Sequence, residues 1–148
     1  MESPKHRILC TEDDCDTLDL LEIMLKDEGY DLTCTQNAEQ ALQLLQIEKF
    51  DLCLIDNWLP GTSGEELCRK IREFDHTTPI LFYSAAAYES DKKRARKAGA
   101  QGYLVKPVTA DQLLRAVARL IAEAEIAAPF TVVPSGELEP IRSNEHFQ

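Results

Sequence analysis

Five polar side chains in this chain follow short apolar runs, and their types suit one kind of chemistry. Glu12 and Asp13 come after one run and Asp56 ends another, while Ser84 and Lys106 end two more. The runs are Ile8–Cys10, Leu52–Ile55, Ile80–Tyr83 and Tyr103–Val105. Short, nearly continuous apolar runs are typical of buried parallel strands. Because ligands bind just past the carboxyl ends of such strands, we expect the five side chains to converge at one sheet edge.

The expected cluster combines three carboxylates with one hydroxyl and one ammonium group. Neighbouring carboxylates repel one another unless a cation joins them, and hard oxygen ligands suit Mg²⁺. The Lys106 ammonium and the Ser84 hydroxyl would then hold oxygens of a phosphoryl group. A carboxylate such as Asp56 can attack phosphorus in line once the charge of the transferring group is neutralised. The pattern therefore predicts a magnesium-dependent site for phosphoryl chemistry.

Strand and helix patterns alternate five times along the chain, which predicts the elements that position this cluster. Strands are expected at residues 7–11, 31–35, 52–56, 80–84 and 101–105. Helices are expected at residues 14–28, from 37 onward, at 63–74, at 88–98 and at 109–121. Residue pairs with capping-box spacing open three of these helices: Asn37 with Gln40, Ser63 with Glu66, and Thr109 with Gln112. Five strand–helix units with short connections predict a doubly wound α/β fold around a five-stranded parallel sheet.

In this order and spacing, the motifs resemble the receiver domain of two-component response regulators. The resemblance covers about residues 6–121 and rests on Glu12-Asp13, Asp56, Leu59-Pro60-Gly61, Ser84-Ala85, Ala98-Gly99-Ala100, Tyr103 and Lys106-Pro107. It implies a flavodoxin-like sheet with strand order 2-1-3-4-5 and five helices. It also implies that Asp56 accepts a phosphoryl group from a histidine kinase or a histidine phosphotransfer protein. Such a domain is a phosphoacceptor that assists its own phosphotransfer and dephosphorylation, and is not counted as an enzyme.

The resemblance implies a Mg²⁺ site made by four residues. Asp13 would bind the cation directly and Glu12 through a water, while Asp56 would give a carboxylate oxygen and Trp58 its backbone carbonyl. Glu12 departs from the commoner Asp of the family. The extra methylene should change the Mg²⁺ affinity of the site more than it affects whether the site exists. The Trp58 indole is interpreted either as a lid or docking contact, or as a side chain tucked against the following helix.

The resemblance also implies a switch. Lys106 precedes Pro107 through a cis peptide and would contact the phosphoryl group. Ser84 would bond a phosphoryl oxygen and draw its loop inward, and Tyr103 would then rotate inward. In response, the chain would switch its partner or its self-association. The surface that does this would be formed by the fourth helix, the fifth strand and the fifth helix.

Composition limits the kinds of partner. The net charge is −10, which argues against binding nucleic acid directly through phosphate contacts. No run of 18 or more apolar residues is present, so membrane insertion is not expected. The first seven residues lack the apolar segment of a signal peptide, and we therefore expect a cytoplasmic protein.

The five cysteines match no zinc or redox spacing. They are Cys10, Cys15, Cys34, Cys53 and Cys68. An odd number without a secretory signal argues against a disulfide framework, so we expect small buried apolar side chains.

The receiver domain is expected to cover residues 1–121, followed by a helix extension and acidic tail at residues 122–148. Pro129 should end the helix, and residues 130–133 form a β-prone apolar run. This run either belongs to a disordered tail or packs on the domain or on a second copy, which makes a homodimer possible.

Three other functions share part of the pattern. A degenerate receiver would be an interaction module that does not depend on phosphorylation, but Asp13, Asp56, Ser84 and Lys106 are intact. A flavodoxin-like nucleotide or flavin binder would share the fold, but residues 11–14 are acidic where a glycine-rich loop is needed. A phosphatase-like hydrolase would need an acid at the position of Trp58. The cognate kinase, the pathway and the output are not encoded in the motifs.

Overall fold

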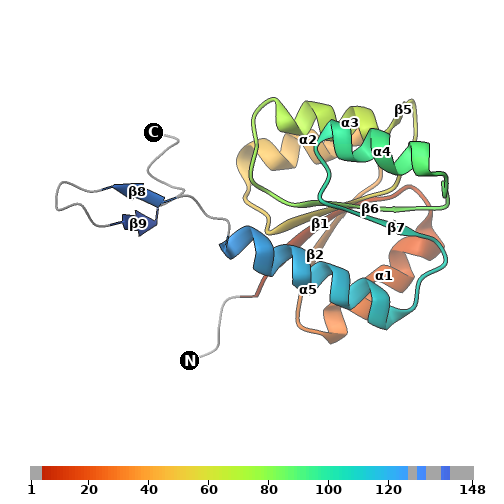
Figure 1. Cartoon of the computed structure of the whole chain (residues 1–148). Helices are drawn as coiled ribbons and strands as arrows, with labels where there is room; N and C mark the ends of the chain where they lie inside the picture. The colour runs from red at the N-terminus through yellow and green to blue at the C-terminus, as the bar shows by residue number, and fades with distance from the viewer. Residues whose placement is uncertain (1–4, 127–129, 133–137, 141–148) are drawn as a thin grey trace.

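A computed structural model of the chain describes residues 5–126, 130–132 and 138–140. Its main sheet has five parallel strands in the order β2-β1-β3-β6-β7 (Figure 1). These strands are β1 (Arg7–Thr11), β2 (Asp31–Thr35), β3 (Leu52–Ile55), β6 (Ile80–Ser84) and β7 (Gly102–Val105). The helices are α1 (Cys15–Asp27), α2 (Ala38–Ile47), α3 (Gly64–Arg72), α4 (Glu89–Ala98) and α5 (Ala110–Ile126). This is the predicted doubly wound, flavodoxin-like order, with five helices.

The helices cover the sheet in two layers. Helices α1 and α5 lie on one face, and α2, α3 and α4 lie on the other (Figure 1). Alternate residues of each strand point to opposite faces, so β1 gives Ile8 and Cys10 to the α1–α5 side and Leu9 to the other. Both faces are therefore dry, and the central strands β3 and β6 are buried along their whole length.

Local signals fix the helix ends. Asp14 caps α1 by accepting a hydrogen bond from the Thr17 backbone at 3.0 Å. Asn37 caps α2 and Ser63 caps α3 in the same way, as the capping-box spacing predicts. Gly99 ends α4 with φ +118°, a conformation that favours glycine. The expected strand over residues 52–56 ends one residue earlier, and the expected third helix ends at Arg72.

Two short antiparallel pairs lie outside the main sheet. β4 (Trp58–Leu59) pairs with β5 (Thr62–Ser63) around a turn at Gly61, which has φ +74°. β8 (Phe130–Val132) pairs with β9 (Leu138–Pro140). The β-prone run is thus confirmed for residues 130–132, while residue 133 lies outside the described part. Among the described residues, no helix is both long and apolar enough to cross a membrane.

The cysteines divide into two groups. Cys10, Cys53 and Cys68 are buried, as expected for small apolar side chains, and all five thiols are free. The expectation is wrong for Cys15 and Cys34, which are exposed. Cys15 begins α1 at its outer end and Cys34 lies on the edge strand β2, so neither position is covered on both sides.

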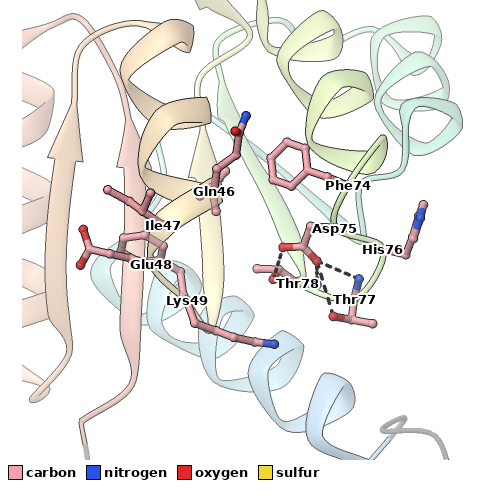
Figure 2. Close-up of a pocket in the computed structure, with 11 residues that line it drawn as sticks. Gln46, Ile47, Glu48, Lys49, Phe74, Asp75, His76, Thr77 and Thr78 are labelled. Carbon is pink, nitrogen blue, oxygen red and sulfur yellow. Dashed lines mark hydrogen bonds between the residues drawn. The ribbon is translucent and has the colours of Figure 1, made fainter. Parts of the chain in front are cut away.

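A pocket opens at the sheet edge where β3 and β6 begin, between the segments that follow α2 and α3 (Figure 2). The Asp75 carboxylate accepts hydrogen bonds from the backbone N–H groups of Thr77 and Thr78, each at 3.1 Å, and from the Thr78 hydroxyl at 2.6 Å (Figure 2). Burial alone would raise the pKa of Asp75, but these hydrogen bonds lower it. The carboxylate therefore organises the turn that leads into β6.

Asp75→Ala should lower the free energy of unfolding at neutral pH by about 1–3 kcal/mol, because several backbone and hydroxyl donors lose their acceptor. The pKa of Asp75 is depressed in the folded state, so its contribution is complete above the unfolded value of about 4. This stability contribution is lost as the pH falls through the lower pKa that Asp75 has in the folded state. Urea unfolding of both proteins from pH 7 to pH 2 measures this difference. His76→Ala, at the exposed neighbouring position, is the control; an equal loss there would contradict the assignment.

Candidate phosphoacceptor and magnesium site

The carboxylates lie where the strand order reverses. Thr11 of β1 is in register with Ile55 of β3, so the residues after these strands are neighbours. The Asp56 backbone N–H also donates to the Thr11 carbonyl at 3.1 Å. The chain runs from β1 outward to β2 and then returns to β3 on the other side of β1. This is the topological switch point at which doubly wound folds bind ligands.

Glu12, Asp13 and Asp56 form one cluster. Each offers a carboxylate oxygen, and these three atoms lie within 4.8 Å of one another. Glu12 and Asp56 are buried, with 2% and 8% of their surface exposed, whereas Asp13 is open to solvent. The two buried acids, Glu12 and Asp56, thus form the floor of a cleft, and Asp13 lies at its opening to solvent.

Lys106 supplies the positive charge of the cleft. Its Nζ donates to Glu12 Oε1 at 2.9 Å and lies 3.7 Å from Asp56 Oδ2. Burial alone would lower the pKa of Lys106, but the hydrogen bond to Glu12 and the charge of Asp56 raise it, so the group stays an ammonium. The peptide bond between Lys106 and Pro107 is cis, as the resemblance implies.

The acidic cluster fits a divalent cation. Burial and the neighbouring Asp56 raise the pKa of Glu12 to about 7, although Lys106 opposes this. Glu12 Oε2 is buried and has no hydrogen-bond partner among the described residues. A buried carboxylate oxygen without a donor is costly unless a cation or water satisfies it. Hard carboxylate oxygens at one open cleft are the donor set that Mg²⁺ prefers.

Ser84 and Tyr103 are linked through one loop. Ser84 is fully buried, and its hydroxyl accepts a hydrogen bond from the Ala86 backbone at 3.1 Å. The Tyr103 hydroxyl donates to the carbonyl of the same Ala86 at 2.7 Å. The Tyr103 ring also stacks on Phe82, with centroids 5.6 Å apart. Tyr103 is therefore partly buried over the β6–α4 connection, and any shift of that connection changes contacts of both residues.

Trp58 lies beside the cluster but is not part of its floor. Its backbone N–H donates to Asp56 Oδ1 at 3.3 Å, while 66% of the residue is exposed. The interpretation that the indole is tucked against α3 is wrong, because the β4–β5 pair holds Trp58 at the surface. The exposed indole suits a lid over the cluster or a contact with a docking partner.

Sequence reasoning missed Gly64, which lies directly behind the acceptor. A Cβ atom at this position would meet the Asp56 carbonyl at 2.6 Å and the Phe82 ring at 2.9 Å. The Gly64 N–H donates to the Asn57 carbonyl at 2.9 Å, which ties the start of α3 to the residue after the acceptor. A glycine directly after a capping serine is the only sequence signal for this close approach.

Comparison with known proteins places these features in one family. The sequence model described as the response regulator receiver domain matches residues 8–118. The chain is 32% identical over 133 residues to the alkaline phosphatase synthesis transcriptional regulatory protein PhoP of Bacillus subtilis, covering 90% of this chain. It spans only 55% of the PhoP length. It is also 41% identical over 112 residues to an uncharacterized 14.6 kDa protein of Leptolyngbya boryana, covering 74% of this chain and 86% of that protein.

Solved structures show the same fold. A CheY-like receiver domain protein from Methanospirillum hungatei superposes with a TM-score of 0.79 at 29% identity, covering 83% of this chain and 98% of that one. The receiver domain of a sensor histidine kinase from Pseudomonas aeruginosa superposes with a TM-score of 0.75 at 30% identity, covering 80% and 99%. That structure has a magnesium ion coordinated in its active site cleft.

Proposed function

Because the chain belongs to the response regulator receiver family, we propose that it is the phosphoacceptor of a two-component phosphorelay and that Asp56 receives the phosphoryl group. The observation that carries this proposal is the cleft in which Asp56 lies between two further carboxylates and the Lys106 ammonium. Family membership also favours this function over a flavin binder or a phosphatase-like hydrolase. The donor would be a histidine kinase or a histidine phosphotransfer protein.

Each residue of the cleft has one task in this chemistry. Asp56 presents a carboxylate oxygen to the incoming phosphorus. Glu12, Asp13, Asp56 and the Trp58 carbonyl would hold Mg²⁺, which when bound supplies charge neutralisation for the transferring phosphoryl oxygens. Lys106, which lies within 4 Å of both Glu12 and Asp56, is placed to bind one of those oxygens.

Phosphorylation would change the conformation of the loop that Ser84 and Tyr103 both contact at Ala86. When the Ser84 hydroxyl donates to a phosphoryl oxygen it would draw along the loop whose Ala86 N–H it holds, and Tyr103 would follow through the Ala86 carbonyl. The surface formed by α4, β7 and α5 would then change its affinity for a protein partner or for a second copy. The receiver unit would end near residue 121, with residues 122–148 as an extension of α5 and a tail.

Intact mass spectrometry tests the acceptor. In Mg²⁺ and acetyl phosphate the chain should gain one phosphoryl group, and Asp56→Asn should gain none, because an amide cannot form the acyl phosphate. Melting curves of both proteins control for folding. Labelling of the mutant to the same extent would reject Asp56, and no labelling of the parent would favour the degenerate receiver.

Trp58→Asn should dephosphorylate severalfold faster than the parent. Hydrolysis needs a water in line with the acceptor, and the exposed indole next to Asp56 would cover that approach while offering neither an acid nor an amide to orient the water. Ala86 likewise offers no polar side chain. Decay of the labelled mass over time gives the rate, and Trp58→Phe, which keeps an aromatic ring, is the control. Equal decay in all three proteins would show that the indole is not the shield.

A further inference from the structure

Cys10 and Cys34 form a cross-strand pair outside the phosphoacceptor cluster. Cys10 of β1 is in register with Cys34 of β2, so both side chains leave the sheet on the same face. Adjacent strands lie about 4.8 Å apart. A disulfide needs Cα atoms separated by about 4.4–6.8 Å. The strand pairing therefore places the two Cα atoms within the range that a disulfide spans.

Hydrogen bonds around the pair fix this register. The Thr35 hydroxyl donates to the Cys10 carbonyl at 3.3 Å and bonds the Thr11 hydroxyl at 3.0 Å. The Glu12 N–H donates to the Thr35 carbonyl at 3.0 Å. The two cysteines thus lie next to a network that resists slippage of β2 along β1.

The two thiols differ in access. Cys34 is exposed because β2 is the edge strand, whereas Cys10 is 1% exposed beneath α1 and α5. A hydrogen bond with the Cys10 thiol lowers the pKa of Cys34, and Lys26 lowers it further, against burial and the charge of Glu22. The thiolate is the reactive form of cysteine. Burial instead raises the pKa of Cys53 to about 12 and that of Cys68 to about 11, so these thiols stay inert.

We propose that Cys34 and Cys10 are a peroxide-sensitive dithiol that closes to an intramolecular disulfide. The Cys34 thiolate attacks one oxygen of hydrogen peroxide, the O–O bond breaks, and Cys34 becomes a sulfenic acid while the second oxygen leaves as hydroxide. The Cys10 sulfur then attacks the Cys34 sulfur, the S–O bond breaks, and the Cys10 proton leaves with that oxygen as water. For hydrogen peroxide, two thiols and one peroxide give one disulfide and two waters. The bond would join edge strand β2 covalently to the strand that leads into Glu12.

The test uses the full chain and hydrogen peroxide, without Mg²⁺ or a phosphodonor, so it is independent of the proposed phosphorelay function. We expect the loss of two hydrogen atoms in the intact mass and a tryptic species joining residues 8–26 to residues 27–49. Dithiothreitol should separate the two peptides. Cys34→Ser should form no such species, while Cys15→Ser should form it fully, although residue 15 lies in the same peptide as Cys10.

Three results would overturn the proposal. One is Cys34 oxidised only to sulfinic or sulfonic acid. Another is a disulfide that disappears in Cys15→Ser, which would assign the bond to the other exposed thiol. The third is a product that is linked only between chains on a non-reducing gel. Circular dichroism of each variant before oxidation shows that the fold is intact.

Discussion

Asp13→Ala is expected to abolish Mg²⁺ binding and phosphorylation together while the chain stays folded. Asp13 is the exposed member of the three-carboxylate cluster, so its removal takes away one ligand without opening a cavity. Loss of one like charge beside Glu12 and Asp56 should leave the melting temperature of the metal-free protein unchanged or slightly higher. Calorimetric titration with Mg²⁺, acetyl phosphate labelling and thermal unfolding measure the three effects.

Asp14→Ala is the matched control, because it removes the neighbouring carboxylate. The Asp14 side chain accepts from the Thr17 N–H at 3.0 Å and caps α1. Its loss should lower the stability of the chain and leave Mg²⁺ affinity intact. The two adjacent acids thus have opposite expected phenotypes. Undiminished Mg²⁺ affinity in Asp13→Ala would remove Asp13 from the site.

Lys106→Met is expected to lower the rate of phosphorylation by about a hundredfold or more, because one positive group aimed at the developing charge is lost. It should also lower the free energy of unfolding by about 1–3 kcal/mol, since the buried Glu12 loses its donor at 2.9 Å. Methionine keeps an unbranched apolar side chain at this position, although the contact of the ammonium with the Tyr83 ring, 4.9 Å from its centroid, is lost as well. Single-turnover labelling and urea unfolding measure the two effects.

Lys26→Met is the control for a lysine in an exposed ion pair. Lys26 lies 3.0 Å from Glu22, and both side chains are largely open to water. Such an exposed pair contributes little to stability, and its loss should leave phosphorylation unchanged. If Lys106→Met were labelled at the parental rate, Lys106 would be a structural partner of Glu12 only.

The amino-acid sequence by itself determined the elements and their order. Five strand segments separated by amphipathic helices allow only a few arrangements, because connections are short and parallel crossovers are right-handed. Capping pairs such as Ser63 with Glu66, and Gly99 after α4, are local signals whose effect does not depend on distant residues. The site residues were predictable for the same reason: each follows a strand, and strand ends meet at one edge.

Only the tertiary structure decided which groups touch and which are open to solvent. Lys106 donates its hydrogen bond to Glu12, which lies 94 positions away in the sequence, and its ammonium is farther from Asp56 than from Glu12. Tyr103 meets the carbonyl of Ala86, a residue whose side chain gives no signal. Gly64 is needed because α3 begins against the Asp56 carbonyl.

The cysteines show the physical reason most clearly. Cys10 ends a continuous apolar run and Cys34 lies in an alternating segment of the second strand, and both were predicted to be buried. Strand order places β1 inside the sheet and β2 at its edge, so one thiol is covered and the other is exposed. Hydrophobic periodicity records which residues a strand can bury, but its neighbours in space determine which of them are buried.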